Sequence, residues 1–135
     1  MELTAYSSIL LIDDDELNNI LNRQFLVFCM PKAHISTFQD ASLVIEYLRS
    51  GKINVPDLIL LDINMPEMNG WEFLFMLDRY NIDCDVMILS SSVHWDDIEK
   101  SKSYSRVKSY LEKPLTEENI RSQVINRNYA HLGLD

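Results

Sequence analysis

The sequence of 135 residues has little glycine and proline and contains no long hydrophobic run. Only 3 glycines and 4 prolines are present, while 47% of the residues are hydrophobic and 24% are charged. This composition argues against disordered and low-complexity chains, and the length suits a single domain, residues 1–135. No apolar stretch approaches the roughly 20 residues of a membrane helix. No signal peptide is visible, because the first apolar run ends in three acids.

Positive charge is also scarce. The 12 lysine and arginine residues are outnumbered by 21 aspartate and glutamate residues, which gives a formal net charge of -9. Because such a surface repels phosphate backbones, we expect no direct nucleic-acid binding, and we expect no membrane association. The two cysteines, Cys29 and Cys84, are far apart and fit no metal-binding spacing. We therefore expect free thiols and a cytoplasmic location.

Five short apolar runs recur along the chain, and each is followed by a stretch with helical spacing. Continuous runs of this kind indicate strands that are buried on both faces, as in a parallel sheet covered by helices. The runs at residues 9–12, 58–61 and 86–89 are continuous, whereas the one around residues 33–38 is weaker and the one at 107–111 has Lys and Ser interleaved. This alternation predicts an α/β doubly wound fold, with a five-stranded parallel sheet and helices on both faces.

The segments between the runs carry apolar residues at helical intervals. One stripe consists of Leu17, Ile20, Leu21 and Phe25, and a second of Leu43, Val44, Tyr47 and Leu48. Ser50-Gly51 is a typical helix end. A third helix follows Gly70, residues 96–104 form a short and exposed helix, and Thr116 is the expected N-cap of the last helix.

Unusual polar residues stand where the predicted strands end. The first strand is followed by Asp13-Asp14-Asp15, the third by Asp62, the fourth by Ser90 and the fifth by Lys113. In doubly wound sheets the ligand site lies beyond the carboxyl ends of the strands. Crowded carboxylates repel one another unless a cation binds, and oxygen ligands of this kind suit Mg²⁺, with Mn²⁺ as an alternative. An aspartate beside Mg²⁺, with lysine and serine nearby, is equipped for phosphoryl transfer.

Taken together, these motifs resemble the response-regulator receiver family of two-component signalling, in particular its chemotaxis-regulator-like single-domain members. The resemblance covers about residues 7–128. It rests on the acid pair Asp13-Asp14, the acceptor motif at residues 61–66 with Gly70 after it, Ser90, and Lys113-Pro114. It implies a flavodoxin-like strand order 2-1-3-4-5, which brings the first, third and fourth strands side by side.

The resemblance also implies a role for each residue that binds metal. Asp62 is similar to the phosphoacceptor. Asp14 resembles a direct Mg²⁺ ligand and Asp13 a ligand through water, while Asn64 offers its backbone carbonyl. The acid pair could instead be Asp14-Asp15, but we favour Asp13-Asp14 because the pair should follow the strand immediately.

Three further residues resemble the family's phosphoryl-binding and switch positions. Ser90, where threonine is commoner, would hydrogen-bond a phosphoryl oxygen, and Lys113 would pair with another. Tyr110 resembles the switch aromatic that moves inward on activation, although the Gly-Ala pair that often precedes it is replaced by residues 107–109. Lys113-Pro114 resembles the family's usual cis peptide bond.

We therefore predict a stand-alone phosphoacceptor without an output domain, and not an enzyme. Its expected phosphodonor is a sensor histidine kinase or a histidine phosphotransfer protein. Its expected output is a conformational change in the fourth helix, fifth strand and fifth helix that alters binding to an unidentified protein, by a monomer or weak homodimer. Two alternatives are an aspartate-nucleophile phosphatase or phosphotransferase, and a receiver that only binds protein. Haloacid-dehalogenase-type hydrolases need a second aspartate where this sequence has Asn64.

Overall fold

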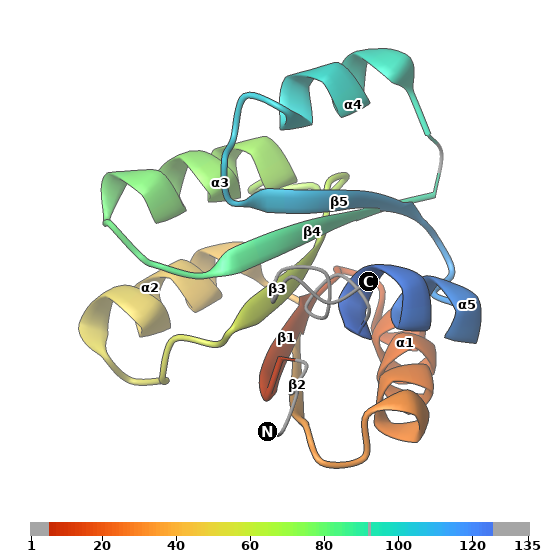
Figure 1. Cartoon of the computed structure of the whole chain (residues 1–135). Helices are drawn as coiled ribbons and strands as arrows, with labels where there is room; N and C mark the ends of the chain where they lie inside the picture. Colours follow the sequence, from red (N-terminus) through yellow and green to blue (C-terminus); the bar gives the residue numbers. More distant parts are fainter. Residues whose placement is uncertain (1–5, 92, 126–135) are drawn as a thin grey trace.

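The computed structural model describes residues 6–91 and 93–125, which form one parallel sheet with helices on both faces (Figure 1). The strand order is β2-β1-β3-β4-β5, as the family resemblance implied. The strands are β1 Ser8–Ile12, β2 His34–Phe38, β3 Leu58–Asp62, β4 Asp85–Ser90 and β5 Val107–Glu112. The predicted core boundary at residue 128 lies outside the described residues, as do Ser92 and His131.

Helices α2, α3 and α4 lie on one face of the sheet, and α1 and α5 lie on the other (Figure 1). Their bounds are α1 Glu16–Cys29, α2 Ala41–Ser50, α3 Gly70–Arg79, α4 Trp95–Ser101 and α5 Glu117–Asn119. The last helix continues as a π-helical turn, η1 Ile120–Ile125. None of the helices in the described ranges is long and apolar enough to cross a membrane.

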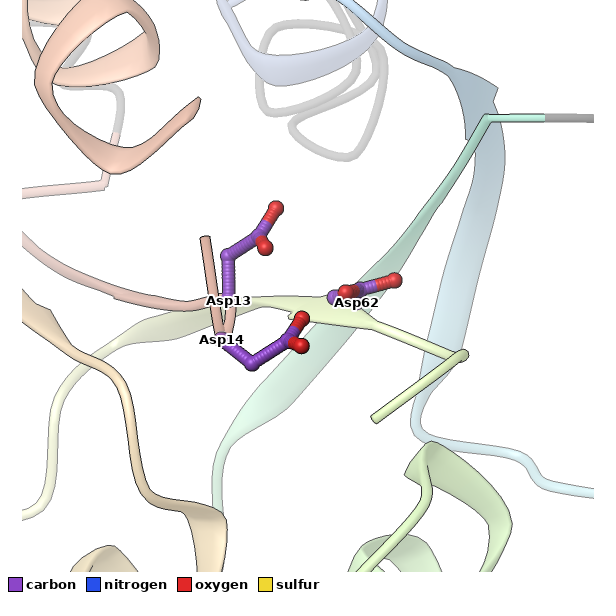
Figure 2. A group of neighbouring side chains, drawn as sticks. All are labelled: Asp13, Asp14 and Asp62. Carbon is purple, nitrogen blue, oxygen red and sulfur yellow. The ribbon is translucent and has the colours of Figure 1, made fainter. Parts of the chain in front are cut away.

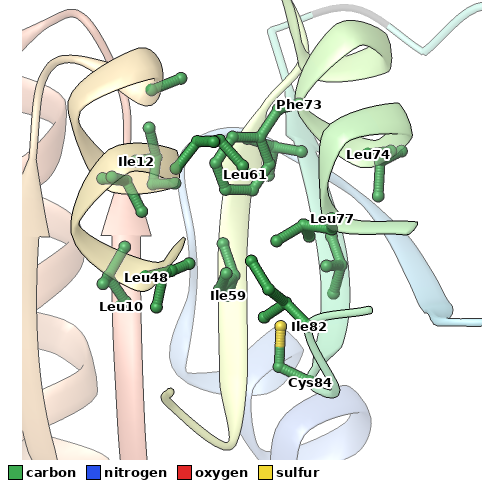
Figure 3. Packing of buried hydrophobic residues seen from close by; sticks show 14 of the residues in the cluster. Leu10, Ile12, Leu48, Ile59, Leu61, Phe73, Leu74, Leu77, Ile82 and Cys84 are labelled. Carbon is green, nitrogen blue, oxygen red and sulfur yellow. The ribbon is translucent and has the colours of Figure 1, made fainter. Parts of the chain in front are cut away.

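The central strand β3 explains why the sheet needs two helical layers. All five of its residues are buried. On one face Ile59 and Leu61 pack in a cluster that includes Phe73 of α3 (Figure 3). On the other face Leu58 and Leu60 pack in a cluster with residues of α1 and η1. Each fully buried leucine or isoleucine contributes about 1.5–3 kcal/mol to folding, so this strand is a rigid base for the carboxylate at its end.

The apolar stripe predicted on α1 does not face the sheet. Leu17 is 61% exposed and Phe25 42% exposed, whereas the buried positions are Asn19, Asn22 and Leu26. Asparagine occupies the inner face because nearby backbone groups need partners there. The Asn19 side-chain amide donates to the carbonyl oxygens of Asp13 (3.0 Å) and Phe38 (3.2 Å), and Asn22 Oδ1 accepts from the N–H of Leu115 (3.2 Å).

Helix ends agree better with the sequence. Gly51 ends α2 with a φ of 78°, a conformation that glycine adopts without strain. The Thr116 hydroxyl accepts from the N–H of Asn119 at 3.0 Å, so it is the predicted N-cap. Helix α4 is short, as expected, and buries only Ser101 among its seven residues.

Arg106, just before β5, links this part of the chain to the loop before β4. Its Nη1 donates to the carbonyl oxygens of Ile82 (2.6 Å) and Cys84 (3.0 Å), and its guanidinium also pairs with Asp78. Beneath it the Cys84 thiol is buried, and burial raises its pKa to about 11. Cys29 is half-buried, and both cysteines are free thiols, as predicted.

Candidate functional site

The three predicted carboxylates meet at the carboxyl edge of the sheet. Strand β1 pairs with β3 so that Ile12 lies opposite Leu61, and the next residues, Asp13 and Asp62, are therefore neighbours. Carboxylate oxygens of Asp13, Asp14 and Asp62 all lie within 4.8 Å of one another (Figure 2). Asp15 is not in this cluster; it is the N-cap of α1 and accepts from the N–H of Leu17, which favours Asp13-Asp14 as the acid pair.

Lys113 completes this cluster from the β5 side. The backbone N–H of Lys113 donates to the carbonyl oxygen of Ser90 at 2.7 Å. The Lys113-Pro114 peptide bond is cis, as the resemblance implied. The Lys113 Nζ lies 2.7 Å from Asp13 Oδ2 and 3.3 Å from Asp62 Oδ1. The lysine therefore bridges the two buried carboxylates.

Burial and charge set the ionisation of the site. Burial raises the pKa of Asp62 above its ordinary value, and the Asp13 charge adds to this, while the Asn64 N–H and the Lys113 ammonium oppose it. Burial alone would lower the pKa of Lys113, but the Asp13 and Asp62 carboxylates reverse this and leave it raised. The Lys113 ammonium favours the nucleophilic carboxylate form of Asp62, but burial outweighs it, and the pKa of Asp62 remains above its ordinary value.

The donor set fits a hard divalent cation. Asp13 Oδ2 is buried, and the Lys113 ammonium, 2.7 Å away, is the donor that reaches it among the described contacts, so that oxygen keeps a lone pair for a cation. Mg²⁺ is bound by oxygen ligands and usually keeps several waters beside one or two carboxylates, so Asp13, Asp14 and Asp62 would hold it directly or through water. Asn64 donates its N–H to Asp62 Oδ1 at 3.1 Å, which holds the acceptor loop against the site.

The start of α3 is pressed against the acceptor strand. The N–H of Gly70 donates to the Ile63 carbonyl oxygen at 3.1 Å. A Cβ atom at Gly70 would lie 2.5 Å from Ile63 Cδ1, 2.8 Å from Ile63 Cα and 3.2 Å from the Asp62 carbonyl oxygen. Only glycine allows this approach, so α3 and the acceptor loop form one packed unit.

The predicted switch residues lie on adjacent strands. Ser90 is buried at the end of β4, and Tyr110 on β5 lies opposite Ile88. The Tyr110 ring packs against the α3-side core, and its hydroxyl is buried. Burial raises the pKa of Tyr110, and the neighbouring Ser90 hydroxyl opposes that increase. The two side chains are therefore close enough for a movement of one to affect the other.

A groove of about 240 Å³ leads from Asp14 to the surface. Its walls come from the loop after β2 and the loop after β3, and the lining residues are Asp14, Gln39, Asp40, Ala41, Met65, Pro66, Glu67 and Met68. No sequence pattern connects Gln39 and Asp40 with the site, because they follow the edge strand β2. The Gln39 amide donates to the Asp14 carbonyl oxygen at 3.3 Å, a contact that no spacing rule predicts.

Comparison with known proteins identifies the family of the chain that carries this cluster of residues. The family model of the response regulator receiver domain matches residues 9–125. The chain belongs to the response regulator receiver family. The transcriptional regulatory protein MalR of Bacillus subtilis is 34% identical over 118 residues, which are 85% of this chain but 47% of MalR. A two-component response regulator structure from Cytophaga hutchinsonii is 29% identical, with a TM-score of 0.79, and the match covers 96% of this chain and 98% of that one.

A second structure gives the same picture. The response regulator receiver protein of Dyadobacter fermentans is 26% identical, with a TM-score of 0.75, and the match covers 90% of this chain and 97% of that one. The chain spans about half the length of MalR. Receiver domains generally bind Mg²⁺ at an acidic pocket, and this chain has an acidic cluster of Asp13, Asp14 and Asp62.

Replacing Asp14 by alanine should separate metal binding from folding. Because Asp14 offers one of three clustered carboxylates and is itself exposed, its loss should weaken Mg²⁺ binding by about 10-fold or more. It also relieves repulsion, so the metal-free stability should hold or rise. Calorimetric Mg²⁺ titration and urea unfolding of the metal-free chain measure the two effects. A marked loss of metal-free stability would mean that Asp14 mainly supports the fold.

Proposed function

We propose that this receiver accepts a phosphoryl group on Asp62 in a Mg²⁺-dependent reaction. The observation that carries the proposal is the contact geometry of Asp62, which is buried within a cluster of two more aspartates and lies 3.3 Å from the Lys113 ammonium. A carboxylate in such a position is a nucleophile next to fixed positive charge. We infer a cytoplasmic receiver whose phosphodonor is a sensor histidine kinase or a histidine phosphotransfer protein.

In the proposed reaction an Asp62 oxygen attacks the phosphorus of a phosphohistidine in line. A P–O bond forms, the P–N bond breaks, and the bond's electron pair leaves with the imidazole of the donor. When bound, Mg²⁺ neutralises charge on the transferring group. Lys113 pairs with one phosphoryl oxygen after loosening its contact with Asp62, and Ser90 hydrogen-bonds another. Asn64, through its backbone carbonyl, joins Asp13, Asp14 and Asp62 as a proposed metal ligand.

Two observations favour this function over the alternatives. Asn64 is exposed and donates only its backbone N–H to Asp62 among the described contacts, so no second carboxylic acid stands where a hydrolase would need its general acid. The complete set of charged partners around Asp62 also favours phosphorylation over a role in protein binding alone. We therefore propose a phosphoacceptor that is not a turnover enzyme.

Mass spectrometry tests the acceptor role. Incubation with acetyl phosphate and Mg²⁺ should increase the mass of the chain by about 80 Da, the mass of one phosphoryl group, and chelation of the metal should prevent this. Continuous release of nitrophenol from nitrophenyl phosphate would instead favour a phosphatase. An unchanged mass with acetyl phosphate and with a panel of phosphorylated kinases would contradict the proposal.

We further propose that the signal leaves through α4, β5 and α5, the segment from Asp96 to Arg127, whose last two residues lie outside the described part. A dianion between Ser90 and Lys113 draws the Ser90 hydroxyl toward it and frees space for Tyr110. Hydrogen exchange with beryllofluoride, a phosphoryl mimic, should change at residues 90–115 and little at residues 42–50. Equal changes in both segments, or none near Tyr110, would contradict this switch.

A further inference from the structure

Trp71 connects the acceptor side of α3 to α4. It is half-buried, and its ring stacks on that of Tyr104, with 6.1 Å between centroids and 25° between planes. The Lys100 ammonium of α4 lies over the same indole, 4.7 Å from its centroid. Stacked rings and a cation over an indole attract each other beyond simple contact. The indole is thus held by two side chains from the α4 side of the molecule.

Tyr104 is fixed to both neighbouring elements. Its N–H donates to the Ser101 carbonyl oxygen at the end of α4 (3.1 Å), and its carbonyl oxygen accepts from the N–H of Val107 at the start of β5 (3.0 Å). Any shift of Trp71 therefore acts on the α4–β5 connection, and a shift of that connection acts on Trp71.

On its other side, Trp71 follows directly after Gly70. Gly70 donates its N–H to the Ile63 carbonyl oxygen at 3.1 Å, and a Cβ atom at Gly70 would lie 2.8 Å from Ile63 Cα and 3.2 Å from the Asp62 carbonyl oxygen. The first turn of α3 is also stiff, because Asn69 and Glu72 form reciprocal hydrogen bonds in a capping box. A stiff turn packed on the acceptor transmits displacement instead of absorbing it.

We propose that Trp71 is a positioning residue for the acceptor. The contacts of Tyr104 and Lys100 with its ring hold the first turn of α3 against Asp62. These contacts therefore couple α4 to the acceptor loop. The inference rests on the proposed phosphoryl transfer to Asp62. It adds a connection through α3 to the proposed route through Ser90 and Tyr110, and it makes the position of α4 a determinant of how fast Asp62 reacts.

The test compares three variants of the full chain by their rate of labelling with acetyl phosphate at fixed Mg²⁺. Trp71→Ala should change the rate by about 2- to 30-fold, the range of effects along coupled contacts. Trp71→Phe, which keeps a ring for Tyr104, should restore most of it. Phe28→Ala is the matched control, because Phe28 is an aromatic residue on α1, on the other face of the sheet (Figure 1), and is 70% exposed; its rate should equal that of the wild type.

Fluorescence provides a second readout that keeps Trp71 in place. The chain has two tryptophans, so Trp95→Phe leaves Trp71 as the sole indole. Its emission should change on addition of beryllofluoride with Mg²⁺, and this change should be absent when Asp62→Asn is added. Tyr104→Leu, which removes the stack from the α4 side, should alter the labelling rate in the same direction as Trp71→Ala.

The outcomes separate the inference from the proposed function. A wild-type chain that is never labelled refutes phosphoryl transfer itself. A second outcome is that the wild type is labelled, while Trp71→Ala and Tyr104→Leu show the same labelling rate and faster hydrogen exchange in α4. That result means that Trp71 only packs against α4, and it overturns the inference. Unchanged Trp71 emission with beryllofluoride in a chain that is labelled overturns it as well, whether or not Trp71→Ala folds.

Discussion

Replacing Asp62 by asparagine is expected to abolish the mass increase with acetyl phosphate. The side-chain amide has nearly the same shape but is not a nucleophile, so the loss should be complete instead of partial. The fold should survive, because Lys113 keeps its closer partner, Asp13 Oδ2 at 2.7 Å. Burial already disfavours charge on Asp62 by raising its pKa, so a neutral side chain there should leave the urea midpoint unchanged or higher.

A neighbouring acid supplies the control for this experiment. Asp15 is exposed and caps α1 through a hydrogen bond from the N–H of Leu17. Asparagine is an equally good N-cap, so Asp15→Asn should preserve both folding and labelling. Labelling that persists in Asp62→Asn would identify another acceptor. Loss of labelling in Asp15→Asn would instead favour Asp14-Asp15 as the metal-binding acid pair.

Replacing Gly70 by alanine should damage stability and reactivity together. The new methyl group would overlap Ile63 Cδ1 at 2.5 Å and Ile63 Cα at 2.8 Å. The side chain of Ile63 can rotate, but the backbone carbon cannot, so α3 or the acceptor loop must move. Overpacking of this kind costs about 1–3 kcal/mol of unfolding free energy. A displacement of about 1 Å at a reacting group slows chemistry by about 100-fold, and we expect labelling to slow toward that extent.

Gly51 offers a matched substitution away from the site. It ends α2 with a φ of 78°, and a Cβ atom there would meet nothing within 4 Å. Gly51→Ala should therefore cost about 1–2 kcal/mol through backbone strain alone and leave the labelling rate intact. Urea unfolding and mass spectrometry measure both variants. Equal labelling by Gly70→Ala and the wild type would show that α3 does not hold the acceptor in place.

The sequence predicted the parts of this receiver that follow from strand burial. Continuous apolar runs mark strands that are covered on both faces, and a carboxylate directly after such a run must lie at the sheet edge. Asp13 and Asp62 could be found in this way, whereas Lys113 follows β5, in which Lys108 and Ser109 interrupt the apolar run. Their convergence depended on the strand order, which came from the family resemblance and not from the runs themselves.

Features that depend on specific packing could not be predicted. The stripe that begins at Leu17 has the spacing of a buried helix face, yet the sheet side of α1 carries Asn19 and Asn22, because backbone groups of Asp13, Phe38 and Leu115 need partners there. Likewise, nothing in the spacing of Trp71 and Tyr104 indicates that their rings stack. Such contacts are decided by three-dimensional neighbours, which periodicity does not encode.

The unequal burial of the two cysteines makes the receiver its own unfolding reporter. Burial raises the pKa of both thiols, but Cys29 is only partly buried, whereas Cys84 is buried beside Arg106 and its pKa is raised to about 11. Thiolates, not thiols, react with alkylating reagents, so we expect Cys29 to be labelled first and Cys84 only when the hydrogen bonds of Arg106 open. The arrival of the second label times that opening without any added probe, and the first leaves a single natural attachment point on α1.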